Sequence, residues 1–282
     1  MAATTKNISS LKSMGTFLKL GTCSESLCHI MNREFNNPLD IEMRGAMPLA
    51  GGIMQHGYQC GMLWGTALAA GAEAHKRFGP GPKAETAAIL AAQRLVKSFR
   101  NLTNEINCLE ITDLDNNSST MKMIYVFLIK GGTIGCLKMA AKFAPIAYDE
   151  IDTALSDNNI DVPPSPVSCT SLLAKKAGLT DMQVTMAAGL AGGIGLSGGA
   201  CGALGAAIWI LAMKLNQEGN SKIKFKDPRA MQLIEKFLQQ SGYKFECSEI
   251  CGKTFKDVNE HASHLCEGKC NKLIDLLATE CQ

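Results

Sequence analysis

The chain has 282 residues, which is enough for one large domain or two of ordinary size. Its net charge is only +2 and no basic stripe appears, so we expect no nucleic-acid partner. It has 12 cysteines but no apolar secretory signal after its polar start, which argues against a disulfide scaffold and for metal binding or catalysis in the cytoplasm.

The first cysteine is expected at the start of a helix. Thr22 can cap this helix, and Glu25 can reach back to complete a capping box, which places Cys23 at the first helical position. The helix is predicted to run toward Phe35 and to stop before Pro38. A thiol at a helix N-terminus lies among unpaired N–H groups, which favour the thiolate that binds metals or does redox chemistry.

A glycine-rich apolar stretch follows and occurs twice, at residues 49–65 and 190–205. Glycine is a poor helix former, so this density predicts a turn and close packing, with the next helix starting at about Cys60 and Cys201. Each of these cysteines is followed at once by a glycine, Gly61 and Gly202. The repetition itself predicts two copies of one structural unit.

Downstream, each copy repeats the same order of elements. An amphipathic helix is predicted at residues 84–99 and again at 228–239, where Asp227 is the expected cap. A short cysteine segment and a final cysteine-bearing helix then follow in each copy. These carry Cys108 and Cys136 in the first copy and Cys247 and Cys270 in the second. The second copy begins at Cys169, with Ser168 as its cap.

The predicted fold is all-α, because the apolar run at 123–129 is an isolated strand signal. We expect two similar helical repeats, at residues 1–155 and 169–282, packed as a pseudo-twofold pair and joined by a Pro- and Asn-containing linker at 156–168. Residues 182–213 carry no charge and resemble a membrane span. The sister stretch contains Gln55 and His56, so we favour a glycine-broken helix pair and no stable membrane insertion.

The order Cys … Cys-Gly-Ala-x-x-Gly … Cys … Cys resembles the C-GCAxxG-C-C family of redox-active proteins, once in each half of the chain. Members of this family are small helical proteins found largely in anaerobes, and the iron–sulfur-binding part of split-Soret cytochromes is similar. Met62 and Ala206 depart from the pattern, and Cys266 competes with Cys270 for the last position. The resemblance implies these cysteines as metal ligands: Cys23, Cys60, Cys108 and Cys136 in the first half, and Cys169, Cys201, Cys247 and Cys270 in the second.

The first interpretation is therefore an electron-transfer protein that holds iron–sulfur clusters through cysteines, with the choice between [2Fe–2S] and [4Fe–4S] left open. Gly61 and Gly202 would allow the backbone to approach the cofactor closely. The partner would be another redox protein, and a homo-oligomer is compatible with the sequence.

Three other chemistries remain open. Cys23 and Cys60, or Cys169 and Cys201, would form the reactive pair of a thiol–disulfide oxidoreductase, although no Cys-x-x-Cys occurs. A structural zinc site would use the C-terminal donors Cys247, Cys251, His261, His264, Cys266 and Cys270. Haem attachment at Cys23, Cys28 and His29 is disfavoured without an export signal, and any single buried cysteine, such as Cys281, is explained by packing alone.

Overall fold

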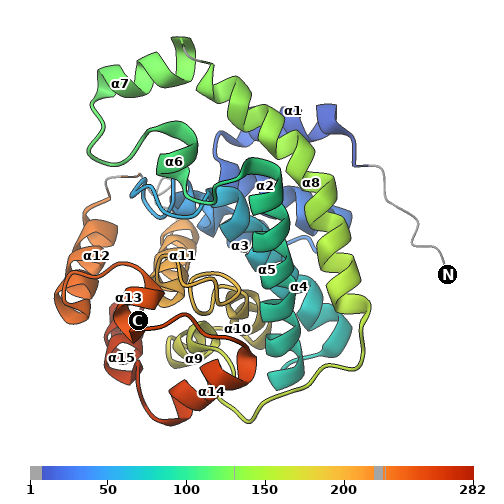
Figure 1. Ribbon diagram of the computed structural model, residues 1–282, viewed down its shortest axis with the longest axis vertical. Helices are drawn as coiled ribbons and strands as arrows, with labels where there is room; N and C mark the ends of the chain where they lie inside the picture. The colour runs from blue at the N-terminus through green and yellow to red at the C-terminus, as the bar shows by residue number, and fades with distance from the viewer. Residues whose placement is uncertain (1–7, 130, 219–224, 226) are drawn as a thin grey trace.

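The computed structural model describes residues 8–129, 131–218, 225 and 227–282, and this part of the chain is helical, with no strand (Figure 1). Only two isolated β-bridges occur in it, between Gln59 and Asn107 and between Ala200 and Glu246. The predicted all-α class is therefore confirmed. The apolar run at 123–129 is helical as well, and forms the end of one short helix and all of the next.

The first half of the chain ends in a long helix that packs against α1, α2 and α5. In chain order its elements are α1 (Ser10–Leu20), α2 (Cys23–Glu34), α3 (Asp40–Gly45), η1 (Met47–Leu49), α4 (Gly61–Phe78), α5 (Pro82–Thr103), α6 (Cys108–Thr112), α7 (Thr120–Ile124), η2 (Tyr125–Ile129) and α8 (Gly132–Ser156).

The second half repeats the plan after a helix-free segment at residues 157–168, and most of its helices are shorter than their counterparts. Its elements are α9 (Cys169–Lys176), α10 (Asp181–Ala188), α11 (Gly202–Gln217), α12 (Pro228–Ser241), α13 (Cys247–Cys251), α14 (Val258–Cys266) and α15 (Asn271–Glu280). By order and by their cysteines, α2 corresponds to α9, α4 to α11 and α6 to α13. The halves differ between the short cysteine helix and the last helix. Here the first half has α7 and η2, whereas the second half has α14.

Two of the three predicted caps are confirmed. The Ser168 side chain accepts a hydrogen bond from the backbone N–H of Ser171, and Asp227 accepts one from Arg229. The capping box at Thr22 is wrong. The Thr22 hydroxyl donates to the Glu25 carboxylate at 3.4 Å, and its oxygen caps no backbone N–H. The Thr22 carbonyl still accepts from the Ser26 hydroxyl, and α2 starts at Cys23 as expected.

A left-handed turn precedes the second cysteine of each half. Five consecutive residues have positive φ, from Gly51 to Gln55 in the first half and from Gly192 to Leu196 in the second. Left-handed backbone costs roughly 1–2 kcal/mol per residue outside glycine. Ile53, Met54 and Ile194 adopt it nevertheless, and their side chains are buried. The same hydrogen bonds close both turns: Gly57 N–H donates to Gly51 O and Gly198 N–H to Gly192 O, each at 2.9 Å.

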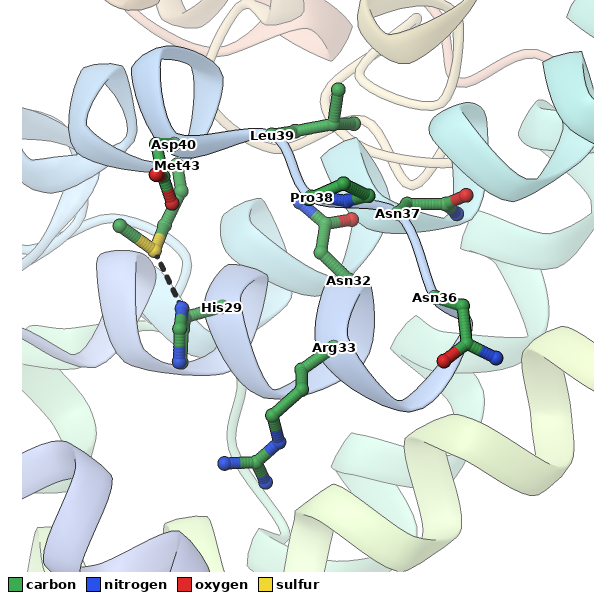
Figure 2. A pocket seen from close by; sticks show the side chains of 9 residues that line it. All are labelled: His29, Asn32, Arg33, Asn36, Asn37, Pro38, Leu39, Asp40 and Met43. Carbon is green, nitrogen blue, oxygen red and sulfur yellow. Dashed lines mark hydrogen bonds between the residues drawn. The ribbon is translucent and has the colours of Figure 1, made fainter.

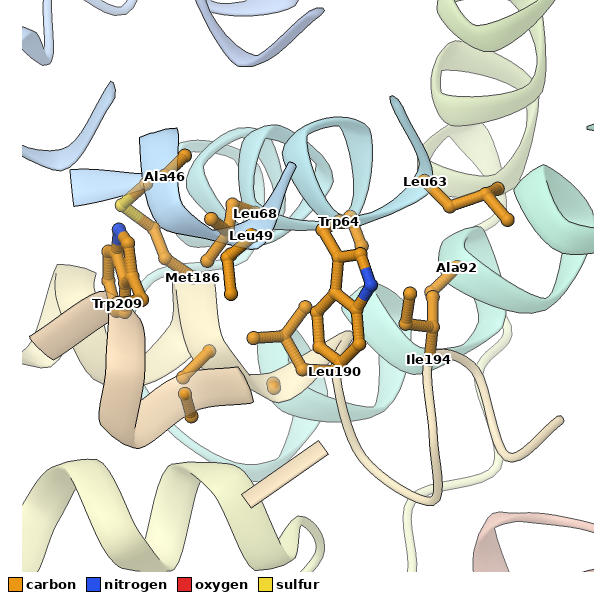
Figure 3. Packing of buried hydrophobic residues seen from close by; sticks show 14 of the residues in the cluster. Ala46, Leu49, Leu63, Trp64, Leu68, Ala92, Met186, Leu190, Ile194 and Trp209 are labelled. Carbon is orange, nitrogen blue, oxygen red and sulfur yellow. The ribbon is translucent and has the colours of Figure 1, made fainter. Parts of the chain in front are cut away.

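The two halves pack on each other reciprocally. Helix α4 packs against α10, and its counterpart α11 packs against α3, the counterpart of α10. Trp64 lies over Gly205, where an added Cβ would come within 2.2 Å of the indole ring. Figure 3 shows Trp64 beside Leu190 at this contact. The indole N–H of Trp209 donates to the Glu42 carbonyl at 2.9 Å. This exchange of contacts agrees with the predicted pseudo-twofold pair.

The uncharged stretch at 182–213 is divided by the left-handed turn. Helix α10 ends at Ala188 and α11 begins at Gly202, so the stretch is the broken helix pair expected from its glycines. Within the described residues, none of the helices has both the length and the apolar character needed to cross a bilayer.

Candidate metal centre

The cysteines of the first half lie at the ends of four separate elements. Cys23 is the first residue of α2, Cys60 precedes α4, Cys108 starts α6 and Cys136 lies in the first turns of α8. Cys60 is buried, and the other three are partly buried. Three of these thiols therefore come from a helix start, where backbone N–H groups lack partners within the helix, whereas Cys136 lies in the second turn of α8.

Short antiparallel bridges bring the second and third cysteines together in each half. Cys60 N–H donates to Ile106 O at 2.7 Å, and Cys108 N–H donates to Tyr58 O at 2.7 Å. In the second half, Cys201 N–H donates to Phe245 O at 2.9 Å, and Cys247 N–H donates to Gly199 O at 2.7 Å. Since α6 and α13 are only five residues long, these bridges are what positions their cysteines.

In the first half, Cys23 and Cys60 form a hydrogen-bonded sulfur pair. The hydrogen bond from the Cys60 thiol lowers the pKa of Cys23, and the backbone N–H groups of Gly51 and Ser24 act in the same direction against the cost of burial. The pKa of Cys60 is raised well above its ordinary value by the same pair and by burial. The left-handed turn thus supplies one of the N–H groups that favour the thiolate form of Cys23.

Cys108 and Cys136 complete the first group. Burial, with the nearby Cys23 charge, raises the pKa of Cys108 to about 11 and that of Cys136 to about 12. The Cys108 sulfur also lies 3.7 Å from the Thr112 hydroxyl. Thiols that oppose one another's ionisation become thiolates more readily when a cation balances their charge, which is what a metal centre supplies.

The glycine after each central cysteine allows close packing, as its position in the motif suggests. A Cβ at Gly61 would lie 2.5 Å from the sulfur of Cys23. At Gly202 a Cβ would meet the Leu190 carbonyl oxygen at 1.8 Å. Gly61 therefore sets the approach of α4 to the first thiol, whereas Gly202 sets the approach of α11 to the left-handed turn.

All four predicted cysteines of the second half line one cavity, together with Cys251, which belongs to none of the motif positions: Cys169, Cys201, Cys247, Cys251 and Cys270. Burial raises the pKa of Cys169 well above its ordinary value, and the Gly192 N–H group opposes this, as Gly51 does for Cys23. Burial also raises the pKa of Cys201 to about 12. In each half, therefore, an N–H group of the left-handed turn, Gly51 or Gly192, hydrogen-bonds the first motif cysteine.

The second half adds a Cys/His cluster that the first half lacks. The Cys251 sulfur lies 3.9 Å from the sulfurs of both Cys247 and Cys270, and the Cys270 sulfur lies 3.7 Å from His264 Nε2. Cys251, His264 and Cys270 hold their donor atoms within 4.8 Å of one another, close enough for one metal ion. Cys251 and His264 do not belong to the four-cysteine motif. The sequence signal that does point to them is the close spacing of cysteines and histidines near the C-terminus, which suggested a zinc site.

Other sequence candidates lie outside this cluster. Cys266 is exposed, with its sulfur near the Ser165 carbonyl, so Cys270 is the one that faces the cavity. His261 is buried and lines the cavity of the motif cysteines, and its Nδ1 contacts the Val167 carbonyl at 3.0 Å. Cys281 is buried, and its sulfur donates to the Ala207 carbonyl at 3.5 Å.

The segment considered for haem has a packing role in the structure. Cys28 is fully buried and its sulfur accepts from the Asn32 amide at 3.6 Å, while burial raises its pKa to about 12. His29 Nδ1 lies 2.9 Å from the Met43 sulfur on the wall of an open pocket of about 480 Å³ (Figure 2). No cysteine lines that pocket, so nothing there places a thiol against a haem.

These features define an all-helical protein with two similar halves, each of which gathers cysteines at helix starts around a left-handed turn. The chain matches the family described as "Putative redox-active protein (C_GCAxxG_C_C)" twice, over residues 22–149 and 167–281. It belongs to this family, and it carries two copies of the family unit. No curated protein and no solved structure matches it.

Proposed function

We propose that the protein transfers electrons through iron–sulfur clusters, one in each half, held by cysteines of that half. The observation that carries the proposal is the single cavity lined by all four motif cysteines of the second half, together with the same cysteine order in the first half and a turn N–H group, Gly51 or Gly192, that hydrogen-bonds the first thiol of each half. Thiolate is the usual ligand of these clusters, and the donor set therefore fits one.

When bound, such a cluster supplies one-electron oxidation and reduction. The residues of the chain bind and tune it: burial of Cys60 and Cys201 excludes water, and N–H groups near the sulfurs stabilise their negative charge. The electron donor and acceptor would be separate redox proteins.

The test is chemical analysis of full-length protein purified without oxygen. Iron, zinc and acid-labile sulfide are measured per chain, together with optical and EPR spectra. Iron with sulfide supports the proposal. Zinc without sulfide, or neither metal with all thiols intact, contradicts it.

A second candidate is thiol–disulfide exchange at Cys23 and Cys60, which is supported by their hydrogen bond and by the lowered pKa of Cys23. In this case the metal-free protein would form a Cys23–Cys60 disulfide reversibly in a glutathione buffer, as mass spectrometry after alkylation would show. Failure of this pair to oxidise in metal-free protein contradicts the candidate.

A further inference from the structure

The cluster at the end of α13 has the dimensions of a metal site. Ligand atoms about 2.3 Å from a tetrahedral ion lie about 3.8 Å apart. The measured separations are 3.9 Å between the sulfurs of Cys251 and Cys270 and 3.7 Å between the Cys270 sulfur and His264 Nε2. It is the one such group of three donors within the described parts of the chain.

The cluster occupies the outer end of the second cysteine group. Cys251 and Cys270 line the inner cavity that also contains Cys169 and Cys201. They also line an outer cavity of about 270 Å³, whose other walls include His264. A metal held by these three residues would therefore lie between the buried motif thiols and the surface.

The histidine ring is held in place by its surroundings. His264 is 7% exposed, and the ring of Phe255 meets it edge-on, with the centroids 4.9 Å apart. Helix α14, which carries His264, is capped by the Asp257 side chain. A fixed imidazole with one nitrogen facing a thiol is arranged as a ligand that needs little reordering.

The first half has a different residue at the corresponding position. Cys251 follows Cys247 by one helical turn, and Thr112 follows Cys108 in the same way in α6. The Thr112 hydroxyl lies 3.7 Å from the Cys108 sulfur, which is the place of the Cys251 thiol in the second half. A hydroxyl is a poor ligand for soft metals, so the first half has no metal ligand where the second half has Cys251.

We infer that Cys251, His264 and Cys270 ligate the metal centre of the second half, which gives it a mixed thiolate–imidazole ligand set, whereas the centre of the first half is held by thiolates alone. The inference rests on the proposed function, that each half binds a thiolate-held centre. Imidazole is a neutral ligand, and replacing thiolate by imidazole raises the reduction potential of an iron–sulfur centre. The second half therefore holds the centre of higher potential.

Pulsed EPR of reduced full-length protein tests the ligand set, because a nitrogen bound to paramagnetic iron gives a strong ¹⁴N coupling. The coupling should be present in the natural chain, lost in His264→Gln and retained in His261→Gln, which removes the other histidine of α14, the one that lines the inner cavity. His264→Cys should keep the iron, lose the coupling and lower the potential of that centre alone. Because His264→Cys supplies another ligand at this position, it still tests the ligand set if His264→Gln fails to fold.

Two kinds of failure are distinguishable. If iron and sulfide are present in both halves, yet the natural chain shows no ¹⁴N coupling and His264→Gln keeps its spectrum, the inference is overturned while the proposed function stands. If iron and sulfide are absent, Co²⁺ titration of the reduced chain decides the ligand set. The absorption of thiolate-bound Co²⁺ should then weaken in Cys251→Ser and His264→Gln but not in Cys266→Ser or His261→Gln. Equal absorption in all four variants overturns the inference.

Discussion

The side-chain amide of Gln59, in the first half, donates a hydrogen bond to the Gly193 carbonyl in the left-handed turn of the second half, at 2.8 Å. The same side chain accepts from the Ala200 N–H group at 2.9 Å. All three groups are buried. The residue that corresponds to Gln59 is Ala200, which cannot return the contact, so this link between the halves runs in one direction only.

Replacing Gln59 by Ala should destabilise the protein by about 1–3 kcal/mol, because the Ala200 N–H group would remain buried without a partner and the Gly193 carbonyl would keep only the Ser197 hydroxyl. Urea denaturation followed by circular dichroism measures the loss. Gln239→Ala is the control, since that amide is exposed and bonds only to Glu235 on its own helix. Equal stability of the two variants would show that the turn does not depend on the link.

Replacing Gly61 by Ala should impair the first centre and spare the second. The added Cβ would lie 2.5 Å from the Cys23 sulfur and 2.9 Å from the Ala50 Cα, so the sulfur or the turn must move. Iron and sulfide should fall by about half, relative to the natural chain, if each half holds one centre of the same type. Gly15→Ala in α1 is the control, because its Cβ would meet nothing within 4 Å. Full metal content in Gly61→Ala would contradict the role assigned to this glycine.

Much of the helical plan is predictable from local sequence. Caps such as Ser168 and Asp227 predict where helices start. The order of the cysteines is the same in both halves although the connecting segments differ. The capping box at Thr22 fails because the Thr22 oxygen accepts no hydrogen bond from a backbone N–H group, and the hydroxyl donates to the Glu25 carboxylate. Sequence spacing does not decide the side-chain orientation that makes one contact and not the other.

The left-handed turns were not predictable in the same way. Glycines mark them, but Ile53, Met54 and Leu196 adopt positive φ only because the folded structure fixes them. Buried side chains and the Gln59 link supply that constraint, and both are tertiary contacts. The sequence therefore locates the turns without revealing their handedness or the N–H groups they present.

The candidate site was predictable in part. The repeated order of cysteines identifies which residues gather, because a repeat places equivalent side chains alike. It does not identify Cys251 or His264, since neither has a cysteine or histidine counterpart in the first half. Their proximity depends on α14, an element found only in the second half, and on the turn at Gly252 that follows α13.

Removing metal with a chelator under reducing conditions should loosen the two short helices more than the rest of the protein. Helices α6 and α13 are too short to be stable alone, and they depend on the bridges and on their cysteines. A metal that binds only the folded state stabilises that state. Hydrogen exchange by mass spectrometry should show faster exchange at residues 106–112 and 245–251, with α4 and α5 as the internal reference. Unchanged exchange at both segments would mean that the metal does not hold them.

Single-cysteine variants should distinguish the cysteines that bind the metal from those that do not. Cys60→Ser should remove the centre of the first half and Cys201→Ser that of the second, because a serine oxygen replaces thiolate poorly on iron. Each variant should therefore keep the spectrum of the other half. Cys28→Ser and Cys281→Ser are the matched controls. Both are buried cysteines, and their sulfurs contact the Asn32 amide and the Ala207 carbonyl and no other cysteine. The two control variants should lower the stability of the protein without loss of iron.

The measurement is iron and sulfide per chain, with the EPR spectrum of each variant. Full metal and unchanged spectra in Cys60→Ser and Cys201→Ser, together with loss in Cys28→Ser, would show that the metal lies elsewhere in the protein.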